Sequence, residues 1–155
     1  MAKVEIKMPE DFLLKVSKLE AHTDEIVERT LEAGGKVVLA KVKGNLSSVA
    51  GSGLENPPSR STGELESALG ISPADVDNSG IHNVKVGFNE PRRKQYAAKG
   101  KRSYYEITNA MIANVIEYGK QSQPPKPFLK PAKSASRTAC QNAMKAKLEE
   151  EIEKL

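Results

Sequence analysis

The feature that most constrains this chain is a long stripe of small and apolar residues near its N-terminus. The stripe advances in steps of three and four, which alternate from Val16 onward: Leu13, Val16, Leu19, Thr23, Ile26, Thr30, Ala33, Val37 and Ala40. Because that spacing keeps side chains on one helical face, it predicts one long helix from Pro9 to about Lys43. At 1.5 Å per residue the helix would be roughly 50 Å long. Such a helix is either an amphipathic core element or a projection that packs on neighbouring subunits.

The sequence around this helix defines its start and its weakest point. Pro9, Glu10 and Asp11 suit a first turn, where a missing N–H costs little and negative charge meets the helix dipole. Gly34-Gly35 permits a kink or break, since each glycine costs about 1 kcal/mol relative to alanine. Residues 44–61 are rich in Gly, Ser, Pro and Asn and are predicted to form a loop. Its GSG lacks the GK[ST] ending of a phosphate-binding loop.

A short helix is predicted to begin near Ser61. Ser61 is a candidate N-cap, and Glu64, three residues on, can reach back to the cap N–H in a capping box. Leu65, Ala68 and Leu69 then form one apolar face.

Two strands are predicted after this helix. Residues 71–76 form at most an edge strand because Pro73 interrupts them, whereas residues 82–88 alternate apolar and polar side chains. Asp77-Asn78-Ser79-Gly80 between them has hairpin-turn composition.

The second half of the chain is predicted to contain two more helices. Within a basic insertion at about residues 91–110, residues 92–102 are predicted to form a loop or an exposed arm. Within residues 104–118 helical spacing is favoured, with Thr108-Asn109 as a start and Gly119 as the stop. Residues 123–131 are proline-rich and extended, and a C-terminal helix follows at about residues 131–153. The fold class is therefore α+β in one domain, residues 1–155: a small antiparallel sheet flanked by long N-terminal, short middle and C-terminal helices.

The charges are partitioned along the chain. The net charge of +4 combines 10 basic and 14 acidic residues in 1–91, 11 basic and 2 acidic in 92–137, and 3 basic and 4 acidic in 138–155. An acidic front and a basic middle can attract nucleic acid, or one another between copies of the chain. No apolar run is long enough to span a membrane.

No catalytic or metal-binding constellation is recognisable. His22 and His82 have no ligand-spaced partners, and Cys140 has no histidine nearby in sequence. The spacing of the carboxylates Glu106 and Glu117 does not indicate a nuclease metal site. We therefore expect no enzyme activity, no cofactor and no metal.

The basic stretch is a candidate interaction surface. Its cationic residues before the predicted helix are Arg92, Arg93, Lys94, Lys99, Lys101 and Arg102, and tyrosines are interleaved at positions 96, 104, 105 and 118. This mixture would suit phosphate contact with some stacking. The cations are nevertheless spread over several predicted elements, so a solvated basic surface is the simpler interpretation.

Three motifs together resemble a known family. Thr62, Gly63 and Leu65 belong to a TGxLxxS-apolar pattern, Glu117, Tyr118 and Gly119 to a Glu–aromatic–Gly element, and Pro127, Phe128, Leu129 and Pro131 to a PxxPFLRPA-like segment. These motifs and their order resemble the head–tail joining and tail-completion proteins (minor tail components) of long-tailed double-stranded DNA phages and prophages. Lys120, where many relatives carry a small hydroxyl residue, and the basic insertion depart from the pattern.

The resemblance implies a structural virion protein. It would form a ring, expected to be hexameric, at the neck or the head-proximal end of the tail, after a stage in the host cytoplasm. Its partners would be itself, connector and tail-tube subunits, and DNA passing through the ring, with no membrane contact. The motif residues would be scaffold: Gly63 and Gly119 allow special backbone conformations, and Phe128 and Leu129 anchor the last helix. The alternative is a basic nucleic-acid-binding protein of a mobile element.

Overall fold

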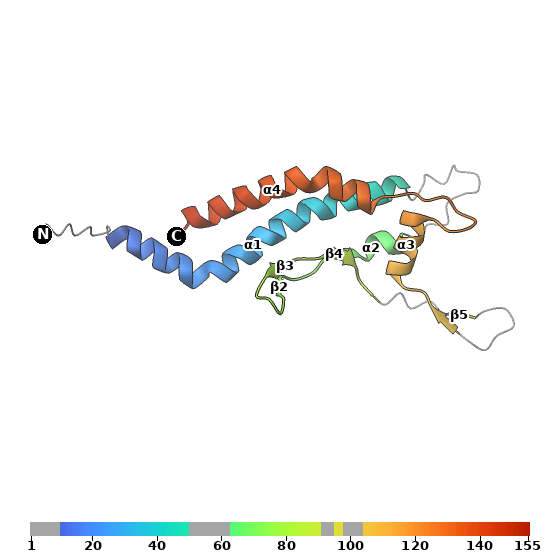
Figure 1. The fold of residues 1–155 in the computed structure, drawn as a ribbon, viewed down its shortest axis with the longest axis horizontal. Coiled ribbons are helices and arrows are strands. Elements are labelled where there is room, and N and C mark those ends of the chain that lie inside the picture. The colour runs from blue at the N-terminus through green and yellow to red at the C-terminus, as the bar shows by residue number, and fades with distance from the viewer. Residues whose placement is uncertain (1–9, 50–62, 91–94, 98–103) are drawn as a thin grey trace, which may run out of the picture.

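Two long antiparallel helices form the body of the structure. The computed structural model describes residues 10–49, 63–90, 95–97 and 104–155. Helix α1 (Glu10–Val49) and helix α4 (Leu129–Glu153) lie side by side and run in opposite directions (Figure 1). The predicted long N-terminal helix is present and ends at Val49, so residues 44–49 are helical rather than part of the expected loop. The rest of that predicted loop lies outside the described residues.

Helix α1 is continuous through Gly34-Gly35, where a kink or break was a possibility. A Cβ on Gly34 would lie 2.6 Å from Met144 Cγ of α4, and a Cβ on Gly35 would lie 2.6 Å from Ile71 Cδ1. The two glycines therefore let α4 approach one side of α1 and a strand approach another side. Close packing on two sides explains the pair better than a hinge does.

The buried face of α1 differs from the predicted stripe. Ile26 is buried as expected, but Leu13 is half exposed, and in the second half Val42 and Leu46 are buried while Ala40 is exposed. A pattern of strict three-four steps has a period of 3.5, whereas an α-helix has 3.6 residues per turn, so the stripe drifts by about 20° per heptad. Toward the C-terminal end of α1 this drift brings Val42 and Leu46 rather than Ala40 to the core, whereas Leu13 lies beyond the end of α4.

The predicted hairpin is present as two short ribbons separated by a bulge. β1 (Leu69–Ile71) pairs with β4 (Val86–Phe88), and β2 (Asp75–Val76) pairs with β3 (His82–Asn83), both antiparallel. In the bulge, residues 72–74 on one strand lie opposite residues 84–85 on the other. Lys85 N donates to Ser72 Oγ at 2.9 Å. A side chain thus replaces a backbone acceptor beside Pro73, which has no N–H for the ladder.

The turn between β2 and β3 has the expected chemistry. The Asp77 carboxylate accepts from the backbone N–H groups of Ser79 and Ile81 at 2.8 and 3.0 Å. Gly80 has a φ of 76°, a conformation that glycine adopts without steric cost.

A third ribbon lies in the basic insertion, for which a loop and an exposed arm were the alternatives. β5 (Gln95–Ala97) pairs with β6 (Tyr104–Glu106), so part of the insertion is a hairpin, which points away from the long helices in Figure 1. The start of the region predicted as helix is therefore strand. Helix α3 (Asn109–Tyr118) follows, and the Thr108 hydroxyl accepts from Met111 N as its cap.

The N-cap of the short middle helix lies two residues after Ser61, the candidate offered by the sequence. Helix α2 (Glu64–Ser67) has Gly63 at its N-cap with a φ of 74° and no side-chain cap hydrogen bond. Ser61 lies outside the described residues. A glycine at this position turns the chain sharply into the helix, and Leu65 is thereby buried.

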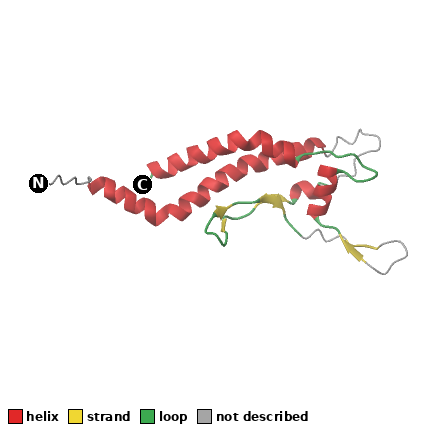
Figure 2. Ribbon diagram, in the orientation of Figure 1, coloured by secondary structure: helices red, strands yellow, loops and turns green. Residues whose placement is uncertain are grey.

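The core lies at one end of the helical pair, where all four helices meet. Its buried apolar residues are Val42, Leu46, Leu65, Ala113, Phe128 and Ala132. Figure 2 shows the ribbons on the α1 side of the pair, away from α4. The α+β prediction is confirmed, although the sheet consists of three separate two-stranded ribbons. Among the helices described, none combines the length and apolarity needed to cross a membrane.

Candidate interaction surface

An unusual helix cap formed by Glu117 joins the end of α3 to the start of α4. Its carboxylate, at the end of α3, accepts from the backbone N–H groups of Phe128, Leu129 and Lys130 at 2.7, 2.8 and 2.9 Å. An α-helix has four N–H groups without partners at its start. Glu117 binds three, and the fourth position is Pro131, which has no N–H. The two motifs that contain these residues therefore form one junction between α3 and α4.

The electrostatics of this junction favour an ionised Glu117. Its side chain is buried, which by itself raises the pKa, but the three backbone hydrogen bonds and the Lys130 charge outweigh burial. The pKa of Glu117 therefore lies below its ordinary value of 4.5. A carboxylate at a helix N-terminus also compensates the positive end of the helix dipole.

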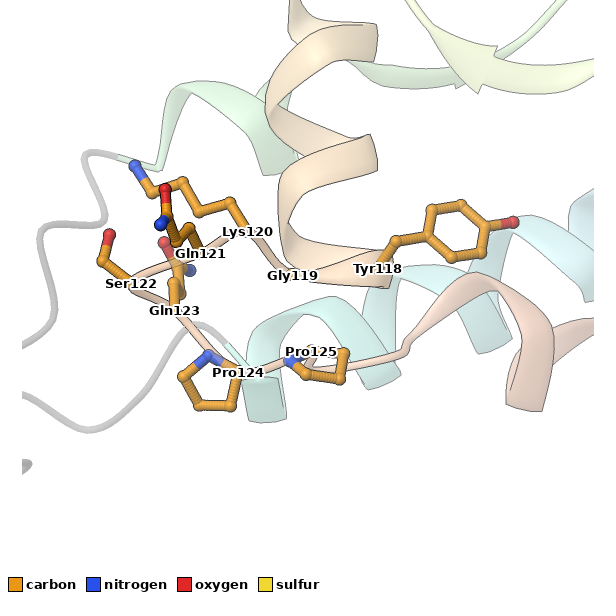
Figure 3. A pocket seen from close by; sticks show the side chains of 8 residues that line it. All are labelled: Tyr118, Gly119, Lys120, Gln121, Ser122, Gln123, Pro124 and Pro125. Atoms are coloured by element: carbon orange, nitrogen blue, oxygen red, sulfur yellow. The ribbon is translucent and has the colours of Figure 1, made fainter.

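Gly119 shapes the turn that connects the two helices. It ends α3 with a φ of 77°, the positive value expected there, and a Cβ would lie 2.7 Å from Gln123 O. Gln123 N donates to Lys120 O and Lys120 N to Gln123 O, both at 2.9 Å, which closes the turn. A shallow surface hollow of about 480 Å³ lies here. Figure 3 shows the side chains that line it, with the Tyr118 ring pointing away from Lys120. The hollow follows from the turn and holds no cluster of reactive groups.

Phe128 anchors α4 in the core. It is fully buried, its ring meets that of Phe88 edge-on at a centroid distance of 6.3 Å, and its carbonyl accepts from Asn45 Nδ2 at 3.1 Å. Leu129 packs against the same core while remaining partly exposed. The anchoring role expected for Phe128 and Leu129 matches these contacts, whereas Pro127 and Pro131 lie at the surface.

An apolar groove runs along α3 beside this anchor. It has a volume of about 430 Å³, and its lining includes Phe88, Met111, Ala113, Tyr118 and Leu129. Met111 and Tyr118 are 54% and 72% exposed. Large exposed apolar side chains that line a groove are typical of a binding surface rather than a solvated face. We call this feature the α3 groove.

The helical pair carries opposite charges at its two ends. Gly34 meets Met144, so this contact divides the pair into halves. The acidic half (α1 residues 10–33 and α4 residues 145–153) has 11 acidic and 5 basic side chains, and the basic half (α1 residues 35–49 and α4 residues 129–144) has 6 basic and none acidic. The helical pair is therefore polar along its long axis, and this division differs from the one in the sequence because α1 residues 35–49, part of the acidic front, lie in the basic half. The α3 groove lies beside the basic half.

An ion-pair network closes the acidic half. Glu151 is buried, and its carboxylate lies 2.9 Å from Lys147 Nζ, 2.9 Å from Lys154 Nζ and 2.8 Å from Arg29 Nη1. Hydrogen bonds from Lys147, Lys154 and Arg29 lower the pKa of Glu151 to about 2. Acidic side chains near the C-terminus of a helix are unfavourable, because they meet the negative end of the helix dipole. Glu151 is instead neutralised by cations from both helices.

Several candidate residues lie where the structure gives no description. These are Thr62 of the TG motif and all six cations of the predicted surface: Arg92, Arg93, Lys94, Lys99, Lys101 and Arg102. Of the other TG residues, Gly63 caps α2 and Leu65 is buried. The structure brings Glu117 and Gly119 together with Phe128, Leu129 and Pro131 at the α3–α4 junction.

Sequence reasoning missed the cap formed by Glu117. One signal was available: the start of α4 has no Ser, Thr, Asp or Asn at its N-cap, which is Phe128. A helix start without a local acceptor requires a distant one, unless water satisfies it. Pro127 and Pro131 instead indicate an extended segment before α4.

The described residues contain no group of three or more His, Cys, Asp or Glu side chains placed to hold a metal ion. Glu117 uses both carboxylate oxygens for backbone N–H groups, and Glu151 is surrounded by cations. His82 is partly buried against α1, with Nε2 3.3 Å from Asp24 Oδ1. These groups therefore serve the packing of elements on one another.

Comparison with protein families gives one match. The model described as "Bacteriophage HK97-gp10, putative tail-component" matches residues 10–119, more than two thirds of the chain. Comparisons with curated proteins and with solved structures give no match. The matched region includes α1, the ribbons, and α3 with Glu117 and Gly119.

Proposed function

Because the chain belongs to the HK97-gp10-like family of bacteriophage tail components, we propose that it is a ring subunit that joins head to tail or completes the tail. The ring is hexameric and lies at the neck or the head-proximal end of the tail. Its neighbours are connector and tail-tube subunits, and DNA passes through it. The subunit accumulates in the host cytoplasm before assembly.

The observation that best supports a ring is the charge polarity of the helical pair. Identical subunits that associate head to tail need two different, complementary patches, and the contact closes into a ring when the rotation closes. A half with 11 acidic and 5 basic side chains and a half with 6 basic ones supply opposite signs on one subunit. Complementary charge steers such association and fixes its register.

The proposed role is structural rather than catalytic. The buried carboxylates that would otherwise be candidates for chemistry, Glu117 and Glu151, hold α4 against α3 and α1. Both have a pKa below the ordinary value, so neither is poised as a general acid near neutral pH.

The test is the mass of the purified full-length protein as a function of salt and concentration. We expect oligomers at low ionic strength that dissociate as salt rises beyond about 0.1 M, where charges more than about 10 Å apart are screened. A protein that stays monomeric at every salt concentration and protein concentration would contradict the ring.

A second candidate is a nucleic-acid-binding protein, favoured by the 6 basic side chains of the basic half, which has no acidic ones. Neutralising several phosphates gives affinity that falls steeply with salt. Gel shifts with duplex DNA at moderate salt distinguish the two candidates. Tight, salt-sensitive binding by the isolated protein supports this alternative, and weak binding together with oligomers supports the ring.

A further inference from the structure

The first two turns of α1 extend past the end of α4. Lys18 Nζ donates to the backbone oxygen of Leu155 at 3.2 Å, so the last residue of the chain lies beside Lys18. Residues 10–17 therefore continue beyond it, as Figure 1 shows at the N-terminal end of α1. We call this segment the α1 tip.

The α1 tip exposes apolar side chains to solvent. Leu13, Leu14 and Val16 are 52%, 58% and 46% exposed. Eight helical residues span about 12 Å, which is long enough to present one apolar anchor set to a partner. The tip begins with Glu10 and Asp11 and contains one cation, Lys15, so its net charge is −1.

The α3 groove has the complementary properties. Met111 and Tyr118 on its rim are among the most exposed large apolar or aromatic side chains in the part of the chain described. Leu129 in the groove is followed by Lys130, which starts the basic half of α4. The groove is thus chiefly apolar and borders the basic half, and the one carboxylate in its lining, Glu117, is bound to backbone N–H groups.

We propose that the α1 tip of one copy docks in the α3 groove of a second copy. This contact rests on the proposed ring and identifies its two surfaces. The tip and the groove lie at opposite ends of the helical pair (Figure 1), so a chain does not fill its own groove and the contact is heterologous. Burial of Leu13 and Leu14 against Met111 supplies the apolar gain, and the charge polarity sets the direction.

A second copy fits this groove better than nucleic acid does. Phosphate backbones are recognised by surfaces lined with cations, whereas the groove is lined chiefly by Phe88, Met111, Ala113 and Leu129. A helix with apolar residues at i and i+3, here Leu13 and Val16, is the usual occupant of such a groove. The matching acidic charge is present on the same helix.

The contact is tested by disulfide cross-linking between two full-length variants that both carry Cys140→Ser. One variant also carries Leu14→Cys and the other Met111→Cys. The control pairs Leu14→Cys with Val76→Cys, a hairpin position that is 49% exposed and therefore comparable with Met111 at 54%. On mixing at low salt under mild oxidation, we expect Leu14→Cys to cross-link to Met111→Cys at least ten times faster than to Val76→Cys, and high salt should remove the difference.

A second pair of variants reports on assembly itself. Leu14→Asp should shift the mass distribution toward monomer, because it places a charge in the apolar groove, whereas Ile81→Asp on the hairpin should leave the distribution unchanged. Circular dichroism of both variants checks that the helices remain.

The outcomes separate the contact from the ring. Oligomers that form without preferential cross-linking, and that tolerate Leu14→Asp, would overturn the docking of the tip and leave the ring intact. A monomer at every salt concentration would overturn both. Preferential cross-linking in oligomers that Leu14→Asp dissociates supports both.

Discussion

Replacing Glu117 tests whether one carboxylate holds the end of α3 and the start of α4 together. Glu117→Ala leaves three backbone N–H groups at the start of α4 without their acceptor. The N–H of Phe128 is buried and bears the full penalty of about 1–3 kcal/mol, whereas the other two are partly exposed and water can reach them. Adding about 1 kcal/mol for the lost cap gives a loss of about 3 kcal/mol in the free energy of unfolding.

Glu117→Gln should cost less than Glu117→Ala, about 1–2 kcal/mol. The amide keeps one acceptor oxygen but turns an NH₂ group toward backbone donors, and it removes the charge that meets the helix dipole. For a chain of this size, 1 kcal/mol corresponds to roughly 2–4 °C in Tm. Urea denaturation at one low protein concentration is the assay, because self-association would add to apparent stability.

The pH dependence of stability gives an independent test of the Glu117 cap. The pKa of Glu117 is lowered by folding, so its contribution is complete above about pH 4.5 and is lost as pH falls through the folded pKa. The difference between the wild type and Glu117→Gln should therefore shrink on acidification. Glu153→Gln, at an exposed position of α4, is the control and should change stability by less than about 0.5 kcal/mol. If Glu117→Gln behaves like this control, the assignment of the cap is refuted.

Three further predictions concern glycines and one ion-pair network. Gly119→Ala should lower the free energy of unfolding by about 2 kcal/mol or more, because φ is positive and a carbonyl lies 2.7 Å from the new Cβ. Gly44→Ala, with open space around it, should raise the free energy of unfolding by up to about 1 kcal/mol, and thermal unfolding of both variants checks the contrast. Gly34→Val should cost about 2 kcal/mol by crowding Met144, and adding Met144→Ala should recover part of the loss in a double-mutant cycle; strict additivity would contradict the close approach. Wild-type stability should fall between pH 4.5 and about pH 2 as Glu151 is protonated, and an equally steep fall in Glu151→Gln would show that this network is not responsible.

The elements with local signals were predictable from sequence. The Thr108 side chain accepts from Met111 N at the start of α3, and the Asp77 side chain closes the hairpin turn, because both act on backbone groups within four residues. Gly80 contributes its positive φ to the same turn. The α+β class and the long first helix follow from periodicity and are confirmed. The predicted stripe is at least partly buried from Ile26 to Val37 and is wrong at Ala40, because a period of 3.5 and a period of 3.6 diverge along the helix.

The elements that depend on distant partners were not predictable. Gly34-Gly35 reads as a weak point in isolation, and only the positions of Met144 and Ile71 show that both glycines are required for close packing. Glu117 reads as one carboxylate among many, because the groups that it binds are more than ten residues away in sequence. Local propensity describes a residue and its neighbours, whereas packing and capping can recruit any segment.

The cap at Glu117 also bears on assembly, because it fixes the direction in which α4 leaves the core. With Phe128 anchored beside Asn45, α4 runs back along α1, so basic segments of both helices lie together and acidic segments lie together. Within one chain this arrangement places like charges side by side, which opposes folding and is only partly relieved by pairs such as Arg29 with Glu151. Between two chains placed head to tail, the same arrangement brings opposite charges together. An electrostatic cost inside the subunit and an electrostatic gain at a heterologous contact are expected of a protein that works as an assembly. Raising the salt concentration should therefore weaken the oligomer while the fold of the subunit is retained.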